Sequence, residues 1–121
     1  MQIEQLKKLV LDTLADMKAR DVSVMDVRGK TAVTDFMIVA SGTSDRHVKA
    51  VAETVAFRAK EAGEPALGSE GVNEGEWALI DLNGVVVHVM LPKVRDFYNL
   101  ERLWSAPAAV ESKAVVHRIG T

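Results

Sequence analysis

The sequence predicts one α/β (α+β) domain in which three helices flank a mixed β-sheet of about four to five strands. Three observations lead to this fold class: helical spacing of apolar residues in separate segments, a β-hairpin signal at Asn83-Gly84, and short β-rich runs between the helical segments. The length of 121 residues is sufficient for one core and too short for two comfortable domains.

The first helix is expected over residues 2–20. Charged residues lie on its outer side. Its apolar residues recur at three- and four-residue steps, namely Ile3, Leu6, Val10, Leu14 and Met17. Residues 22–27 and 33–41 are short and β-rich, and the turn-like residues 28–30 between them favour antiparallel pairing.

A second helix is expected to begin after Thr43 or Ser44, either of which can cap it, and to stop at Gly63. Its apolar face is formed by residues at helical spacing, namely Val48, Val51, Ala52, Val55 and Ala59. Residues 64–73 form a polar connection with room for a brief strand over residues 66–69.

The hairpin is the best-defined element. Asn-Gly between two apolar runs favours a type I′ turn, in which both central residues have positive φ. This turn fixes the register and places on the core side the pairs Leu82 with Val85, Ile80 with Val87, and Ala78 with Val89. The opposite side carries the pairs Asp81 with Val86, Leu79 with His88, and Trp77 with Met90. That side needs a cover, which is either another element of the fold or a partner.

Pro92 opens a last helix, which is expected over residues 93–104. The residues on this helix that can reach the core are Phe97, Leu100, Leu103 and Trp104. Its other long side chains point elsewhere: Arg95, Tyr98 and Arg102. Residues 105–121 lack sustained periodicity and are interpreted as a C-terminal extension of unknown role, partly disordered or adding one short strand over residues 114–119.

Composition excludes several classes of function. The chain has no cysteine, which removes disulfides, thiolate metal sites and cysteine nucleophiles. No apolar run approaches the roughly 20 residues that span a bilayer, and residues 1–20 do not resemble a signal peptide, so no membrane association and a cytoplasmic location are expected. A net charge of −2 gives no general attraction to nucleic acid and suits a basic protein partner better.

No cofactor or metal site is expected. The three histidines, His47, His88 and His117, lack a spacing that would bring them to one metal. His88 is more readily a packed or hydrogen-bonded histidine than a ligand or a base. Gly29-Lys30-Thr31 resembles the end of a phosphate-binding P-loop, but Val24 stands where that motif requires glycine.

The turn of residues 41–44 allows two interpretations. One is an ordinary capped helix start, and the other is an anion site, because free N–H groups at a helix start attract anions. Nucleotidyltransferases begin their active site with such a turn but then need closely spaced carboxylates for magnesium, and no Asp-x-Asp follows here. The sequence therefore predicts no enzyme, with a nucleotide-binding or nucleotidyltransferase-like enzyme as the alternative.

Several separated motifs together resemble the ribosomal silencing factor family, RsfS or Iojap-like. They are Thr34-Asp35-Phe36, SGTSDRHVKAVAE from Ser41, Glu70-Gly71, Trp77, Ile80-Asp81, VVVHVM and RDFYNLERLW. The resemblance covers roughly residues 3–104, in order and with matching spacing, so residues 1–104 are interpreted as the domain and residues 105–121 as the extension. Ser41, where many members have threonine, is a mild departure.

The resemblance implies a fold related to nucleotidyltransferases that lacks the catalytic carboxylates. It also implies binding to the large ribosomal subunit through its L-series protein fourteen, so that the small subunit cannot join. Translation would then be repressed under nutrient limitation or in stationary phase. Steric exclusion of this kind needs affinity and bulk but no chemistry. A homodimer formed through the same exposed apolar surface is a further hypothesis.

The family pattern and the hairpin geometry together predict the residues that bind the partner. Pattern alone leaves open whether Trp77 is a core residue under a helix or a partly exposed interface anchor. With the resemblance, Trp77 is expected to be the anchor, accompanied by Leu79, Met90 and Tyr98. Polar contacts around them are expected from Glu70, Asp81, His88 and Arg95.

Overall fold

A computed structural model of the chain describes residues 1–32 and 34–99. Its elements are, in chain order, α1 (Ile3–Asp16), β1 (Arg20–Asp26), β2 (Phe36–Ser41), α2 (Asp45–Glu61), β3 (Gly68–Glu70), β4 (Trp77–Asp81), β5 (Val85–Met90) and α3 (Pro92–Tyr98). The strands form one five-stranded sheet in the order β1-β2-β5-β4-β3. This architecture confirms the predicted mixed sheet with three helices.

The sheet is mixed because β2 and β5 run parallel, whereas the other neighbouring strands are antiparallel. The chain leaves β2, passes through α2 to β3 at the far edge, and returns through β4 and β5, which fill the gap between β2 and β3. Every residue of β2 and β5 is buried, which agrees with their nearly continuous apolar sequences, FMIVAS and VVVHVM. The hairpin therefore supplies the centre of the sheet.

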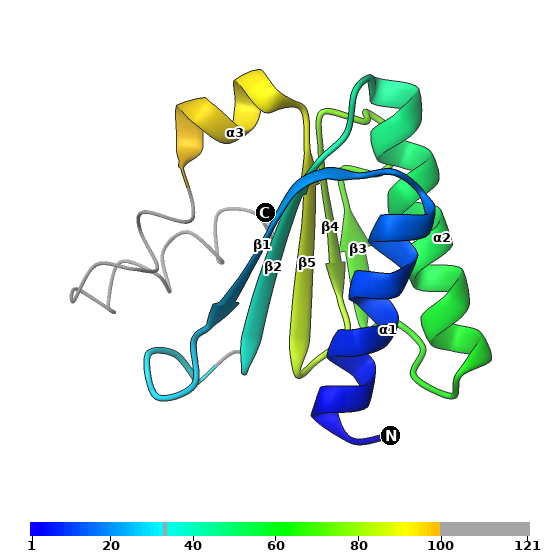
Figure 1. Ribbon diagram of the computed structural model, residues 1–121, viewed down its shortest axis with the longest axis vertical. Helices are drawn as coiled ribbons and strands as arrows, with labels where there is room; N and C mark the ends of the chain where they lie inside the picture. The colour runs from blue at the N-terminus through cyan, green and yellow to red at the C-terminus, as the bar shows by residue number, and fades with distance from the viewer. Residues whose placement is uncertain (33, 100–121) are drawn as a thin grey trace.

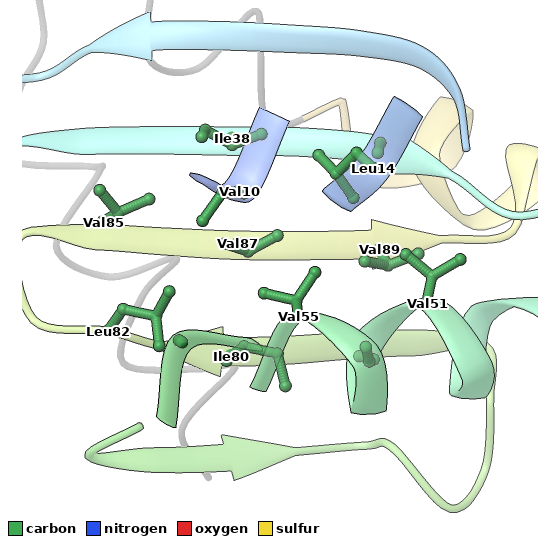
Figure 2. Packing of buried hydrophobic residues seen from close by; sticks show 14 of the residues in the cluster. Val10, Leu14, Ile38, Val51, Val55, Ile80, Leu82, Val85, Val87 and Val89 are labelled. Carbon is green, nitrogen blue, oxygen red and sulfur yellow. The ribbon is translucent and has the colours of Figure 1, made fainter. Parts of the chain in front are cut away.

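The two faces of the sheet are covered differently. Figure 1 shows α1 and α2 side by side along one face, with α3 at one end of the opposite face. The main core lies under α1 and α2, and Figure 2 shows Val10 and Leu14 of α1 and Val51 and Val55 of α2 directed at the valines of β5. All three predicted core-side hairpin pairs lie in this core. Their six residues are Ala78, Ile80, Leu82, Val85, Val87 and Val89.

The first half of the chain differs from prediction at the element ends. Helix α1 ends at Asp16 and not at residue 20, because Lys18 has a φ of +60° and Arg20 already pairs with Ser41 as the start of β1. Strand β2 begins at Phe36, later than the predicted residue 33, which lies outside the described residues. The predicted antiparallel pairing of these two strands is confirmed.

The second helix follows the prediction closely. Ser44 is its N-cap, with the side-chain oxygen accepting the N–H of His47, and Gly63 follows the last turn with a φ of +87°. The five predicted apolar residues of this helix are all buried. The brief strand after it is Gly68–Glu70, displaced by one or two residues from the predicted 66–69.

The hairpin register is confirmed in every pair, but the predicted turn type is wrong. Asn83 has a φ of +74°, as a type I′ turn requires, whereas Gly84 does not have a positive φ in the left-handed region. Gly84 serves a different purpose, because a Cβ built on it would overlap the Cδ1 of Ile3. Its carbonyl also accepts the N–H groups of Asp35 and Phe36, at 3.1 and 3.0 Å. The close approach of the Ile3 side chain from α1 leaves no room for a Cβ unless that side chain shifts.

The last helix is shorter than predicted. Helix α3 ends at Tyr98, and Asn99 caps it in the left-handed conformation with a φ of +47°. The expectation that Phe97 reaches the core is wrong, because 81% of its surface is exposed and Val94 is the residue of α3 that packs on the sheet. The remaining predicted core residues of this segment and the predicted strand over residues 114–119 lie outside the described residues.

Candidate partner-binding surface

The face of the sheet opposite α1 and α2 carries a second, smaller apolar cluster. Its buried members are Val27, Met37, Val39 and Met90. Three half-buried residues pack against it, each from a different element: Met25, Trp77 and Val94. This is the second hairpin face that the sequence marked as needing a cover, and within the described residues α3 provides part of that cover.

Trp77 lies at the edge of this cluster, where β4 begins. It pairs with Met90 across the sheet, and its side chain is half-buried. Gly71 stands close behind it with a φ of +71°, and a Cβ at that position would collide with the backbone carbonyl of Trp77. The tryptophan therefore combines both sequence interpretations, since it packs on the cluster and is not fully buried.

A buried histidine holds the indole of Trp77. The Nε1–H of Trp77 donates to Nδ1 of His88 at 3.0 Å, and the two ring centroids are 6.0 Å apart. His88 is completely buried in the middle of β5, and this burial lowers its pKa from 6.5 to about 3, so the imidazole is neutral at neutral pH. The residue expected to contact a partner thus has no surface with which to do so.

On its other side, Trp77 meets Tyr98 of α3, which in turn contacts Phe97. The rings of Trp77 and Tyr98 have centroids 4.6 Å apart, and the ring of Phe97 lies edge-on to Tyr98 at 5.0 Å. These three residues are called the aromatic cluster below. Exposure increases outward along the aromatic cluster, from the half-buried Trp77 through Tyr98 at 50% to Phe97 at 81%. Contiguous exposed aromatic surface of this kind is typical of a protein interface.

Arg95 fixes α3 beside the sheet. Its guanidinium donates to the hydroxyl of Ser41 at 2.9 Å and to that of Ser23 at 3.2 Å, so it joins α3 to the neighbouring strands β2 and β1. The side chain is half-buried, and charge-assisted hydrogen bonds in such a position are stronger than neutral ones. Arg95 therefore helps to hold the aromatic residues of α3 in place, together with the packing of Val94 on the sheet.

The remaining predicted contact residues lie in three different places. Met90 is fully buried and pairs with Trp77 across the sheet, and Leu79 is 8% exposed and pairs with His88, so neither presents a free surface to a partner. Glu70 is exposed on the edge strand opposite Leu79. Asp81 lies at the other end of β4, roughly 13 Å along the strand from Trp77, and its carboxylate accepts the N–H of Asn83 in the hairpin turn.

The surface next to Trp77 is acidic. The segment that leads from β3 to β4 exposes three carboxylates, Glu70, Glu74 and Glu76, immediately before the tryptophan. Asp96 of α3 is exposed beside Phe97. Carboxylates at the rim of an apolar patch favour a partner that is itself basic.

Phe97 is the exposed aromatic residue that sequence reasoning misassigned. A helix of seven residues completes only two turns, so helical spacing does not define one buried face in it. Its neighbour Tyr98, which the same helical pattern directed away from the core, is exposed as expected.

The start of α2, the other candidate site in the sequence, has the geometry of a capped helix. The N–H of Thr43 donates to Nδ1 of His47 at 2.9 Å, and the N–H of His47 donates to the hydroxyl of Ser44 at 3.1 Å. On its other side, Nε2 of His47 lies 2.8 Å from the carbonyl oxygen of Met17. His47 therefore links the start of α2 to the end of α1, and two N–H groups of this turn already donate within the chain.

Neither a metal-binding group nor a membrane-spanning helix is found in the part of the chain that the structure describes. Residues 1–32 and 34–99 contain no group of three or more His, Asp or Glu side chains arranged to hold a metal ion. Within the same ranges, no helix has the length and apolar character needed to cross a membrane.

Comparison with known proteins gives one consistent family. A sequence model described as "Ribosomal silencing factor during starvation" matches residues 1–119. The protein named "Ribosomal silencing factor RsfS" in Chromobacterium violaceum is 48% identical over 104 residues, which is 86% of this chain and 85% of that protein. The mouse protein "Mitochondrial assembly of ribosomal large subunit protein 1" is 32% identical over 100 residues, covering 80% of this chain and 44% of its own length.

A solved structure agrees with the sequence comparison. The crystal structure of a protein from Chromobacterium violaceum superimposes with a TM-score of 0.85 at 47% identity, covering 88% of each chain. Similarity in fold and in sequence therefore extends over the same large part of the molecule. The chain belongs to the ribosomal silencing factor (RsfS) family.

Proposed function

We propose that this protein binds the large ribosomal subunit through L-series protein fourteen and sterically blocks joining of the small subunit. Translation is thereby repressed under nutrient limitation or in stationary phase. Family membership supports the proposal, and so does the name of the mouse relative, which refers to the large ribosomal subunit. The single observation that carries it is the exposed aromatic cluster of Trp77, Tyr98 and Phe97.

The aromatic cluster suits a protein partner on physical grounds. Aromatic residues dominate the binding energy of many interfaces because they remove a large apolar surface from water with few rotatable bonds. The carboxylates next to Trp77 add long-range attraction to a basic ribosomal protein and repulsion from RNA phosphates. In this proposal Trp77, Tyr98 and Phe97 make the contact, Glu70 lies at its rim, and Leu79 and Met90 support it.

Co-sedimentation with purified large subunits tests the binding step. The wild-type chain is expected to pellet with the subunits, and Trp77→Ala, checked for folding by circular dichroism, is expected to bind at least tenfold more weakly, as is typical of a central aromatic anchor. Phe57→Ala is the matched control, because Phe57 is an exposed aromatic on α2, in the layer on the other face of the sheet. A wild-type chain that stays in the supernatant would refute the proposed function.

Two further measurements separate the partner from the mechanism. Calorimetry with isolated L-series protein fourteen is expected to show binding that Trp77→Ala weakens. Light scattering on mixing large and small subunits is expected to show slower and less complete joining when the protein is present. If the protein binds L-series protein fourteen but does not affect joining of the two subunits, the proposed partner stands and steric exclusion is refuted as the mechanism.

We also propose that the fold is related to nucleotidyltransferases and that the protein works without catalysis. The start of α2, where those enzymes hold their substrate, is occupied here by capping contacts between Thr43, Ser44 and His47. Calorimetry with the four nucleoside triphosphates and magnesium is expected to show no heat of binding. Saturable binding of any one of them would favour the alternative, a nucleotide-binding enzyme.

We also propose that the protein can form a homodimer. A homodimer through the aromatic cluster would hide the surface that meets the ribosome, so dimerisation and ribosome binding would compete. Analytical ultracentrifugation of the wild-type chain and Phe97→Ala tests this, since the variant is expected to dissociate more readily.

Cell fractionation is expected to place the protein in the cytoplasm. A chain shortened after residue 104 is expected to bind the ribosome like the full chain.

A further inference from the structure

His88 is an unusual residue for its place in the fold. It lies in the middle of β5, a central strand whose other five residues are valine and methionine, and it is completely buried. An apolar side chain of similar volume would fill the same space without a polar group to desolvate. Packing alone therefore does not account for a histidine at this position.

The hydrogen bond to Trp77 determines the state of the imidazole. An indole N–H can only donate, so Nδ1 of His88 must be the acceptor and the proton of the neutral ring must be on Nε2. Nε2 is buried and has no hydrogen-bond partner within the part of the chain that the structure describes. The histidine thus makes one hydrogen bond to a side chain, and that bond is directed at the tryptophan of the partner-binding surface.

Trp77 is consequently held from two sides. His88 fixes the indole nitrogen from within the sheet, and Tyr98 packs against the ring from α3 at a centroid distance of 4.6 Å. A half-buried tryptophan at the start of a strand would otherwise have several rotamers available to it. Fixing one rotamer before binding removes an entropy cost that the complex would have to meet.

We propose that His88 is a positioning residue, whose Nδ1 lone pair holds the Trp77 indole in the orientation that the partner recognises. This inference rests on the proposed function, but it changes the role of His88 from a contact residue to one that acts through Trp77. It also distinguishes His88 from Met90, which lies in the buried apolar cluster against which Trp77 packs.

The first test uses the chain that carries the single substitution Trp104→Phe, so that Trp77 is its one remaining tryptophan. Long-range proton–nitrogen NMR of the imidazole groups at pH 7 is expected to show His88 with the proton on Nε2 and an unprotonated Nδ1. The signal is assigned by its loss in His88→Asn. A proton on Nδ1 would overturn the proposal, whatever the protein binds.

The second test compares two substitutions by co-sedimentation with large ribosomal subunits. His88→Leu keeps the volume and removes the acceptor, and it is expected to weaken binding by roughly three- to tenfold, the value of one buried hydrogen bond. His88→Asn places an amide oxygen near the position of Nδ1 and is expected to restore most of the affinity. In the Trp77→Phe background, which has no indole N–H, His88→Leu is expected to have no further effect.

The outcomes separate this inference from the proposed function. If the wild-type chain binds and a folded His88→Leu binds equally well, the positioning role is refuted and the function stands. Equal losses in His88→Leu and His88→Asn, or a loss that persists in the Trp77→Phe background, would also refute it, because either would indicate packing alone. If the wild-type chain does not bind, the function fails, and the NMR experiment still decides the tautomer. Should His88→Leu not fold, the comparison of wild type with His88→Asn and the tautomer remain decisive.

Discussion

Arg95 donates a hydrogen bond to the hydroxyl of Ser41 at 2.9 Å and so connects α3 to the end of β2, 54 positions earlier in the chain. The same guanidinium reaches Ser23 in β1. A helix of seven residues is too short to be stable on its own, so its position depends on tertiary contacts. The place of Phe97 and Tyr98 in the aromatic cluster therefore depends on an arginine that does not itself belong to it.

Replacing Arg95 with methionine is expected to loosen α3. Methionine keeps the length of the side chain but removes both charge-assisted hydrogen bonds, which together are worth about 2 kcal/mol in local stability. The N–H of Asn99, which donates to the carbonyl of Arg95 at 2.8 Å, should then exchange with solvent roughly thirtyfold faster. Hydrogen-exchange mass spectrometry of α3 measures this, with the exposed Lys93→Met as the control. Unchanged exchange would show that the packing of Val94 and Tyr98 is sufficient to hold the helix.

Phe97→Ala is expected to weaken binding to the large subunit by about tenfold without lowering stability. The side chain is 81% exposed, so it contributes little to the folded core, but it is the outermost ring of the aromatic cluster. Phe57→Ala, at 61% exposure on α2, removes a similar ring elsewhere and should leave affinity unchanged. Equal effects of the two variants in the co-sedimentation assay would remove the aromatic cluster from the interface.

The buried His88 makes stability depend on pH. Its pKa is lowered from 6.5 to about 3 by burial, so between these values the unfolded chain binds a proton that the folded chain does not. Stability is therefore complete above pH 6.5 and falls as the pH drops from 6.5 toward 3. From pH 7.5 to pH 5 the expected loss is about 2 kcal/mol.

Urea unfolding at pH 7.5 and pH 5 measures that loss. His88→Asn has no group that titrates in this range at position 88, so its stability should change less between the two pH values than that of the wild type. The salt-bridged Asp26 does not interfere, because its ordinary pKa of 3.8 and the value of about 2 to which the hydrogen bonds from Arg28 lower it both lie below pH 5. A wild type and variant with the same pH dependence would show that His88 is not desolvated in solution.

Gly71→Ala is expected to destabilise the protein more than Gly63→Ala does. Both glycines have positive φ, so each substitution costs about 1 kcal/mol in backbone strain. A Cβ at Gly63 meets nothing within 4 Å, whereas a Cβ at Gly71 collides with the backbone carbonyl of Trp77. Urea unfolding should therefore separate the two by at least another 1 kcal/mol. Equal destabilisation would mean that the segment before Trp77 can move aside freely.

Local sequence signals predicted the elements well and their ends less well. Ser44 and Gly63 bounded α2 correctly, because capping and helix termination depend on residues adjacent in the chain. The predicted end of α1 is four residues too late. Helical spacing of apolar residues continues through Met17, but Arg20 already pairs with Ser41 as part of the sheet. A long-range contact of this kind leaves no mark on local periodicity.

The sequence by itself determined the hairpin and its register, because the alternation of side chains and the two-residue turn leave only one pairing that buries the valines of β5. It also determined the family, through motifs that are spread along the chain. Only the tertiary structure decided which residues of the second hairpin face remain accessible. That outcome depends on where α3 settles, and α3 is placed by Arg95 reaching two serines on other strands. His88 thus became a buried partner of Trp77, while Phe97, expected in the core, became the most exposed ring of the aromatic cluster.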